Sequence, residues 1–307
     1  MSFSRNLMFG ILLSLGLTSL VPMDASAIPA FARKYRVSCQ LCHNPFPALT
    51  AFGDQFAGNG FRMAFDEEPR DTIATGDDLL TLPASLPLAI RLDAYAQLYA
   101  NGKAATDFQM PWNLKVLSGG TLGKKLSYYI YFLLAERGEV AGVEDAFIYW
   151  NDIGGAPVDL AVGQFQVSDP IFKRELRLEV LDYAIYKVVV GLQPANLTYD
   201  RGFMASADLA GFTITGTLIN GDGIPAINPA FKYDNDANKN LFGHITRDLG
   251  SHARLGVMGY TGRQNGDYYG FPDQSNDISM WGVDGTFGAG MFQLNLQYVA
   301  RTDTEAE

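Results

Sequence analysis

Hydrophobic and polar residues alternate with a period of two over most of the chain after residue 88. In residues 91–101 the leucines and alanines share one face, while Arg, Asp, Tyr, Gln and Asn share the other, and residues 292–301 show a similar alternation. Such alternation indicates β-strands with one apolar and one polar face. Turn residues separate further strand candidates near 110–119, 125–135, 143–151, 157–166, 183–193, 197–208, 211–220, 239–249, 252–263 and 278–287. The pattern predicts about twelve antiparallel strands.

Two architectures produce this alternation: a soluble β-sandwich or barrel with an apolar interior, and an outer-membrane β-barrel with an apolar lipid face and a polar lumen. Strand candidates of around ten residues suit a tilted membrane strand. The polar faces carry Gln, Asn, Asp and Arg rather than mainly Lys and Glu, as a watery lumen would. Aromatic residues near strand ends resemble the interfacial girdles of membrane barrels; they are Tyr95, Tyr99, Tyr128, Tyr129, Tyr131, Phe147, Tyr149, Trp150 and Tyr298.

We therefore predict a mostly β fold, in which residues 88–307 form an antiparallel transmembrane β-barrel behind a small α-helical segment. After the N-terminal region, no stretch approaches the length of continuous apolar sequence that a membrane-spanning helix needs. The net charge of −10 argues against nucleic acid as a partner.

Residues 1–27 read as a secretory signal peptide. Arg5 precedes an apolar run from Leu7 to Val21, and Ala25-Ser26-Ala27 supplies small residues for cleavage. The run is too short to span a bilayer as a helix, although an uncleaved membrane anchor is the alternative. We expect an exported protein whose mature chain begins at Ile28.

Residues 28–70 form a separate block, and residues 71–87, with several acidic residues and prolines, are predicted to be a linker. Residues 45–57 are predicted to form a helix, ended by Gly58-Asn59-Gly60. Its apolar face consists of Phe46, Leu49, Phe52 and Phe56. That face packs either on ordinary core or on a porphyrin, and we favour the porphyrin because so short a block has difficulty holding a core alone.

Cys39-Gln40-Leu41-Cys42-His43 is the C-x-x-C-H attachment motif of c-type haem. Each thiol is expected to form a thioether with the porphyrin, and His43 is expected to be the proximal iron ligand. The alternatives are a disulfide, a zinc site and a thioredoxin-like pair. Zinc needs further ligands, but His244 and His252 are far away in sequence, and no βαβ context supports a thioredoxin-like pair.

The distal ligand is open at this stage. Met63 follows the predicted helix and is able to fold back over the ring, and methionine opposite histidine raises the haem potential. Met110, His244 and His252 are alternatives, as is an open or water-bound site. Met63 is also consistent with a plain apolar loop residue.

Two charged stretches allow two interpretations each. Residues 166–180 break the alternation with mixed charge, as either a loop folded into the lumen or a solvated turn. Arg33, Lys34 and Arg36 precede the motif, and they either pair with the haem propionates or are simple surface charge.

The N-terminal block resembles the opening of fused monohaem cytochrome c–porins of bacterial outer membranes. The resemblance rests on Phe31–Tyr35, the haem motif, Phe46–Leu49, Phe52-Gly53 with Phe56, and Asn59–Met63. Downstream, Gly163–Gln166 and Asp169-Pro170 resemble strands of phosphate-selective and related porins. The resemblance is specific for the first 40 mature residues and diffuse over the barrel.

This family includes outer-membrane iron oxidases, so the resemblance implies electron transfer across the outer membrane. The implied partners are periplasmic c-type cytochromes, an extracellular electron donor or acceptor, and outer-membrane lipid. Two alternatives are a porin for small solutes with the haem segment as a plug, and a soluble periplasmic haem protein with a β domain. Relatives have about sixteen strands and usually end in an aromatic residue. The acidic end of this chain therefore suggests a fragment lacking its last hairpins, or a smaller barrel with an acidic tail.

Overall fold

The computed structural model describes residues 30–44, 48–63, 72–77, 81–83, 87–97, 107–171, 183–190, 195–234, 236–250, 252–268, 271–289 and 292–304. The predicted signal peptide lies outside these residues, as do Phe46 and Tyr99. Within the described part, no helix is long and apolar enough to cross a membrane.

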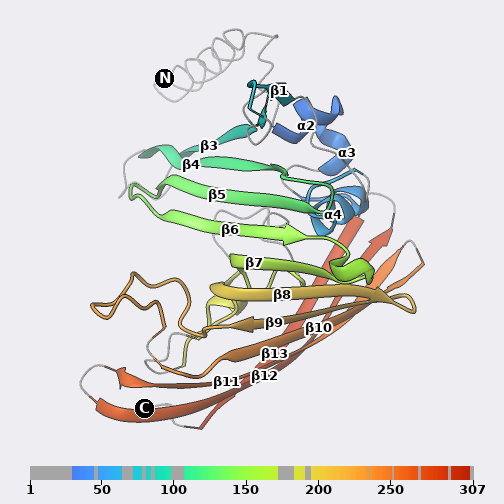
Figure 1. Cartoon of the computed structure of the whole chain (residues 1–307). Coiled ribbons are helices and arrows are strands. Elements are labelled where there is room, and N and C mark those ends of the chain that lie inside the picture. Colours follow the sequence, from blue (N-terminus) through green and yellow to red (C-terminus); the bar gives the residue numbers. More distant parts are fainter. Residues whose placement is uncertain are drawn as a thin grey trace, which may run out of the picture.

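One antiparallel sheet holds eleven strands in sequence order, each paired with its neighbours along the chain (Figure 1). The strands are β3 (Leu88–Gln97), β4 (Asp107–Thr121), β5 (Leu126–Glu136), β6 (Gly142–Trp150), β7 (Asp159–Gln166), β8 (Tyr199–Leu209), β9 (Phe212–Ile219), β10 (Asn240–Leu249), β11 (Ala253–Tyr268), β12 (Phe271–Ala289) and β13 (Phe292–Asp303). Every strand candidate except residues 183–193 is confirmed. The candidates could be recognised because alternation with a period of two fixes which face of the sheet each residue takes.

The prediction for residues 183–193 was wrong. Their described part contains the 3-10 helix η3 (Ala184–Lys187) instead of a strand. The amide of Leu197 donates to the carbonyl of Tyr186, and the Tyr186 ring is buried in the core. The apolar residues here belong to a helical turn that packs on the sheet. The pattern of a short apolar run does not distinguish such a turn from a strand.

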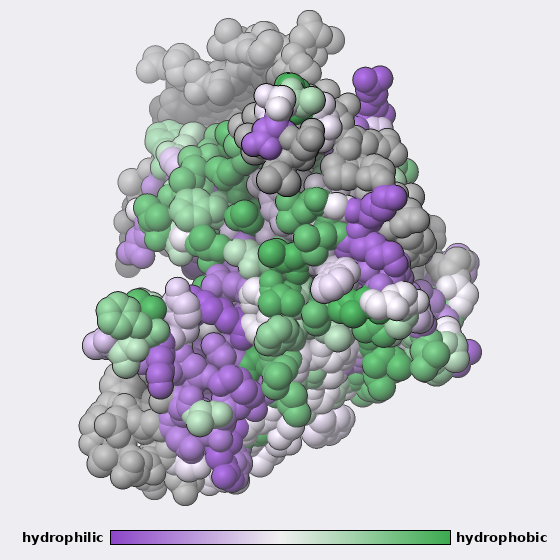
Figure 2. Space-filling view, in the orientation of Figure 1, coloured by the Kyte–Doolittle hydropathy of each residue, from purple (hydrophilic) through white to green (hydrophobic). Residues whose placement is uncertain are grey.

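The two faces of the sheet differ in chemistry. The outer face exposes aliphatic and aromatic side chains such as Ile130, Ile148 and Leu218, and Figure 2 shows hydrophobic residues gathered over the strands. The inner face buries polar side chains, among them Asp200 and His244. The inner face also carries an apolar cluster that includes Phe242 and Ile278, so it is mixed in character. The apolar outer face is the feature expected for strands that face lipid.

The sheet is strongly curved but has two edges. Within the described strands, β3 and β13 are these edges and are not paired with each other. The structure therefore shows a curved antiparallel sheet of eleven strands, and its closure into a barrel stays a prediction.

The connections at the two ends of the strands differ in length. At one end, residues 122–125, 151–158, 210–211 and 250–252 link successive strands, and we call this the short-turn end. Residues 151–158 include the 3-10 helix η1 (Ile153–Gly155). At the other end lie the longer residues 167–198 and 220–239 together with residues 137–141, and we call this the long-loop end.

We call residues 167–198 the inner connection, and their described parts, residues 167–171, 183–190 and 195–198, fold onto the inner face of the sheet. Val167, Ile171, Tyr186 and Leu197 are buried there. They join one apolar cluster with strand residues Phe165, Ile219, Phe242, Met258, Tyr260, Ile278 and Met280. The described ends of this segment thus favour the inward-folded loop over the solvated turn, while the charged run 173–179 lies outside the described residues.

Among the described residues, three helices precede the sheet: α2 (Ala30–Tyr35), α3 (Cys39–Cys42) and α4 (Ala51–Gly58). The α4 helix begins later than the predicted residue 45 or 46, because Leu49 forms a bridge with His43 and the Thr50 hydroxyl accepts the Gly53 amide as a cap. A small hairpin of β1 (Thr72–Ala74) and β2 (Thr81–Pro83) lies in the segment predicted as a linker.

Candidate haem site

The predicted haem-attachment residues lie on one short helix and its end. Cys39 and Cys42 are three residues apart on α3, a spacing that puts both side chains on one helix face. His43 follows directly, and its amide donates to the Cys39 carbonyl at 2.9 Å. Both thiols are free, Cys39 is exposed and Cys42 is half-buried. The structure thus brings these three residues together in one turn.

The backbone of this motif is fixed by the loop and helix that follow. The Thr50 amide donates to the Cys42 carbonyl at 2.8 Å, and the Thr50 hydroxyl donates to the Leu41 carbonyl at 2.6 Å. Gly53 packs so closely on the Cys42 backbone that a Cβ there would overlap the carbonyl. Glycine at this position therefore lets α4 lie directly against the motif.

The surroundings of the second thiol of the motif shift its pKa. Burial raises the pKa of the Cys42 thiol, and the neighbouring Cys39 raises that pKa further. Within the described residues, no group of three or more His, Cys, Asp or Glu side chains is arranged to hold a metal ion. Cys39, Cys42 and His43 therefore do not form a metal site by themselves.

Apolar side chains accompany the motif. Leu41 is 39% exposed and Phe52 is 38% exposed. Phe56, from the same predicted face, is instead buried, and its ring lies edge-on to Phe31 and Tyr35. The face therefore divides: Phe56 packs in the segment's own core, and Phe52 remains accessible. Two reachable thiols, an adjacent imidazole and exposed apolar groups are the set that a covalently attached porphyrin needs, so the residues fit haem c.

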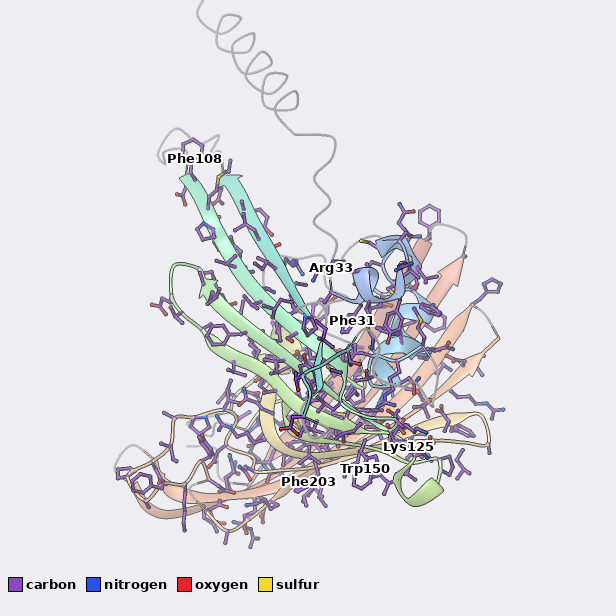
Figure 3. All side chains as sticks on the ribbon, turned by 45° about the horizontal axis from the view of Figure 1, so that its top comes forward. Phe31, Arg33, Phe108, Lys125, Trp150 and Phe203 are labelled. Carbon is purple, nitrogen blue, oxygen red and sulfur yellow. The ribbon has the colours of Figure 1, made fainter. Side chains whose placement is uncertain are left out.

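The helical segment, residues 30–63, is docked on the inner face of the sheet at the short-turn end. The Phe61 ring stacks on Tyr129 with centroids 4.5 Å apart. Phe31 lies against Gly119 of β4, where a Cβ would meet its ring at 2.8 Å. In Figure 3 Phe31 lies within the curve of the sheet, and Trp150 and Phe203 lie away from it. Aromatic contacts thus hold this segment to β4 and β5.

Polar bonds fix the same docking. The Arg62 side chain is 1% exposed, and its guanidinium donates to the carbonyls of Gly123 (2.7 Å) and Lys124 in the β4–β5 turn. The Tyr149 hydroxyl donates to the Gly58 carbonyl. From β11, Arg254 forms an ion pair with Asp54 at 2.9 Å. The segment therefore spans from β4–β6 to β11 across the concave side.

This docking corrects part of the predicted aromatic girdle. Tyr129, Tyr131, Phe147 and Tyr149 were expected near lipid, but they lie on the inner face, where Tyr131 is buried. Tyr129 and Tyr149 contact the helical segment. Ser127 also points inward. Because side chains alternate between the two faces of a strand, every second residue from Ser127, and the residues paired with them on β6, point inward as well. Residues that do face outward include Trp150, which is exposed.

The candidate distal ligands lie in different places. Met63 is half-buried next to Arg62, which is anchored at the β4–β5 turn, and its role as a ligand stays a prediction. Met110 is near the start of β4, at the long-loop end, far along the strand from the helical segment. His252 is exposed in the β10–β11 turn at the short-turn end.

His244 is occupied elsewhere. Its Nε2 lies 2.8 Å from Asp284 Oδ2, and both side chains are buried on the inner face. Gly256 stands opposite this pair, where a Cβ would meet both side chains within 2.6 Å. The structure therefore places His244 in a carboxylate pair within the sheet.

The basic residues before the motif contact the sheet. Arg33 donates to the Leu88 carbonyl at 2.7 Å, and the Lys34 ammonium donates to the Thr121 hydroxyl at 3.3 Å. Arg36 is exposed. The proposed pairing with haem propionates stays a prediction, and two of the three residues take part in docking the segment.

Sequence reasoning missed Arg62, Gly53 and the Asp54–Arg254 pair. The sequence did contain a sign that Arg62 is buried and bonded, because it is the one charged residue among Phe61, Met63 and their apolar neighbours. The pair had none, because its members are 200 residues apart.

A cavity of about 270 Å³ lies at the long-loop end, between the inner connection and the strands. Buried Gln166 and Tyr186 line it, together with Arg137, Glu144 and Lys187. It is polar and mixed in charge, and it lies at the opposite end from the haem motif.

Comparisons with known proteins are sparse. No family model matches the chain, and no curated protein matches it. Among solved structures, a loop L8 deletion mutant of OmpT, an outer membrane protein of Vibrio cholerae, is similar over 71% of this chain and 83% of its own, at 13% identity and a TM-score of 0.34. A TM-score this low does not establish a common fold.

Proposed function

We propose that this protein is a monohaem c-type cytochrome joined to an outer-membrane β-barrel. In this proposal it passes electrons between an extracellular donor or acceptor and periplasmic c-type cytochromes. The observation that carries it is the attachment motif, fixed by a docked helical segment at one mouth of a sheet whose outer face is apolar.

The outer face supports a membrane location. Isoleucine, valine, leucine and tryptophan side chains stand exposed along the outer face from β3 to β12, with polar groups buried on the inner face. In water each exposed side chain of that size would cost about 1.5–3 kcal/mol relative to burial. Many such side chains on one face favour lipid over a soluble periplasmic β domain.

Orientation follows from the connections. Outer-membrane barrels have short periplasmic turns and longer extracellular loops. The helical segment lies at the short-turn end, so in this proposal the haem motif faces the periplasm. A periplasmic cytochrome then has access to the exposed side of α3.

The residues of the motif divide the work between attachment and ligation. Cys39 and Cys42 would hold the porphyrin covalently, and His43 would bind the iron from the proximal side. When bound, haem supplies a one-electron redox centre whose potential is set by its ligands and burial. Leu41 and Phe52 would cover apolar edges of the ring, and the bonds from Thr50 keep the motif in place.

The length of the strands sets the distance between an extracellular donor and the haem. A ten-residue strand such as β10 is about 33 Å long, and a lipid band is about 25 Å tall. An extracellular donor would therefore have to enter the concave side to approach the haem. The concave side carries polar side chains, and the chain's net charge of −10 would favour cationic donors.

A porin for small solutes is the second candidate, and the polar inner face favours it. The inner connection and the helical segment occupy that face at opposite ends, which favours the conduit. A matched pair of assays separates the two. Proteoliposomes containing the protein are tested for reduction of a trapped dye by an external reductant and for swelling in sugar solutions.

A conduit reduces the dye with little swelling, and a porin does the reverse. Before either assay, the haem-stained band should fractionate with the outer membrane and change its gel mobility on heating. A haem-free protein, or one that stays soluble without detergent, would refute the proposal.

A further inference from the structure

The cavity at the long-loop end contains a buried acceptor that no described protein group satisfies. Gln166 lines this cavity and is only 5% exposed. Its Nε2 donates to the Ser168 hydroxyl at 2.7 Å, whereas its Oε1 has no hydrogen-bond partner among the described residues. A buried, unpaired acceptor lowers the stability of a fold, so native proteins keep few of them. An acceptor of this kind in a cavity wall indicates a place where a bound molecule donates a hydrogen bond.

The position of this acceptor is fixed from behind. Ser168, which holds the other end of the amide, is completely buried. The Val167 amide donates to the Thr198 carbonyl at 2.8 Å, and the Ser168 amide donates to the Leu197 carbonyl at 3.1 Å. Both ends of the inner connection therefore hold Gln166 in place, and a ligand would meet an oxygen that is already oriented.

Tyrosine rings form the apolar part of the cavity wall. Tyr183, Tyr186 and Tyr199 all line it, and the rings of Tyr183 and Tyr186 are 6.0 Å apart and nearly edge-on. The Tyr186 hydroxyl has no hydrogen-bond partner of ordinary geometry, and the Gln297 amide near it has none either. Aromatic faces beside a few oriented polar atoms are typical of sites for small organic molecules.

The charged side chains of the wall already interact with other groups. Arg137 forms an ion pair with Glu136 at 3.1 Å. The Tyr199 hydroxyl donates to Glu144 at 3.3 Å, and Lys187 also has an interaction partner. A charged ligand would have to compete with these contacts, but a neutral ligand that hydrogen-bonds to Gln166 leaves them intact. The wall therefore favours hydroxyl groups over charged groups.

The volume of the cavity limits the size of the ligand. The cavity measures about 270 Å³. Since a water molecule in the liquid takes up about 30 Å³, this space corresponds to about nine waters. Pockets for drug-sized ligands begin near 300 Å³. The space therefore suits a single six-membered ring with its hydroxyl groups.

We propose that this cavity binds a neutral polyhydroxylated solute of the size of a monosaccharide. One hydroxyl of the solute donates to Gln166 Oε1, a second contacts the Tyr186 hydroxyl, and the C–H groups of its ring face the tyrosines. The site lies at the opposite end of the sheet from the haem motif, so it goes beyond the proposed function and does not depend on haem. No covalent bond forms or breaks.

Direct binding tests the proposal. The full chain in nanodiscs is titrated with D-glucose and, separately, with glycine, a small zwitterion, and saturation-transfer difference NMR is compared with that of empty nanodiscs. We expect a Kd of about 1–10 mM for glucose, as the small size of the ligand allows. Glycine should bind roughly tenfold more weakly or less. No glucose signal above that of empty nanodiscs, or glycine binding as tight as glucose, would overturn the proposal.

Two variants locate the site. Gln166→Leu removes the unpaired acceptor at nearly constant volume and should weaken glucose binding by roughly tenfold. Tyr186→Phe keeps the packed ring and should weaken binding by roughly three- to fivefold. An unchanged heat-dependent gel shift shows that each variant is folded. Unaltered affinity in a folded Gln166→Leu protein, together with unaltered affinity in Tyr186→Phe, would refute the assigned site.

Gln264→Leu is the matched control. Gln264 is a glutamine of similar burial whose Oε1 is also unpaired among the described residues, and it does not line this cavity. Its replacement should leave glucose affinity within about twofold. A loss equal to that of Gln166→Leu would mean that glucose does not bind in this cavity.

A cysteine-free variant separates this inference from the proposed function. Cys39→Ser/Cys42→Ser lacks the thioether positions but keeps the cavity wall, so it should bind glucose as the wild-type protein does. If the wild-type protein carries no haem and glucose still binds, the proposed function fails and the solute site stands. If haem is attached and electrons cross while glucose does not bind, only the solute site fails.

Discussion

The two ends of the sheet differ in how their connections are held. At the short-turn end, brief turns are fixed to a folded segment by directed contacts, such as Arg62 to the β4–β5 turn and Asp54 to Arg254. At the long-loop end, the inner connection is held largely by an apolar cluster and by Arg301. Short-range directed contacts at the first end fix the position of the helical segment more closely than apolar packing alone would. The second end surrounds a polar cavity of mixed charge.

The largest expected effect is the loss of the attachment site at the short-turn end. Cys39→Ser/Cys42→Ser removes both thioether positions, so no haem should survive a denaturing gel. The measurement is haem staining together with the absorbance spectrum. Met110→Leu, at the other end of β4, should keep full staining. Staining of the double serine variant would show that the motif does not hold haem.

Arg301 tests the long-loop end. It donates to the carbonyls of Val188 (3.0 Å) and Ala195 (2.6 Å) and pairs with Asp303, with both side chains nearly fully buried. Arg301→Gln leaves the Asp303 carboxylate buried, so we expect about 3–5 kcal/mol of lost stability. Faster hydrogen exchange in residues 183–198 is the readout.

Arg263→Gln is the matched control, because Arg263 forms the same two-bond pair with Asp277 on the exposed surface. It should leave the stability almost unchanged, because an ion pair exposed to solvent contributes little. If both variants behave alike, Arg301 does not hold the inner connection.

Arg62 tests the docking of the helical segment. Arg62→Gln removes two charge-assisted bonds to carbonyls from a buried position, which should cost about 2–3 kcal/mol. Limited proteolysis should then cut within residues 30–63 while the strands stay protected. Lys34→Gln, which removes a long bond to the Thr121 hydroxyl and a contact with the Tyr35 ring, should leave the segment resistant. If both variants resist proteolysis, the stack of Phe61 on Tyr129 is the main contact that holds the segment to the sheet.

The smallest effect concerns the contact between α4 and β11. Asp54→Asn breaks an ion pair whose side chains are 34% and 43% exposed, so we expect about 0.5 kcal/mol. Thermal unfolding at low and high salt should show the difference only at low salt. A loss of several degrees that persists at high salt would mean that this contact does more than neutralise charge.

The strands were predictable because alternation is a local property of the sequence. Eleven candidates, from 91–101 to 292–301, are strands of one sheet. The C-x-x-C-H motif is also a local feature of the sequence, and its assignment to haem stays a prediction. The start of α4 was missed, since it depends on the Thr50 cap and on the bridge between His43 and Leu49.

What sequence reasoning could not reach depends on long-range contact. The aromatic residues of β5 and β6 read equally well as a lipid girdle or as an inner platform, and only the docked segment decides between these. Residues 183–193 show the same limit, because packing on the sheet selects a 3-10 turn over an extended strand. Arg62 contacts a turn some 60 residues away, which no local pattern reveals.

The position of the helical segment has a consequence for biogenesis. A segment that touches both β4–β6 and β11 is enclosed when those strands curl around it. Haem attachment needs access to both thiols from solution, and that access is greatest before the curl forms. Under the proposed function, haem attachment should therefore come before the strands curl around the helical segment.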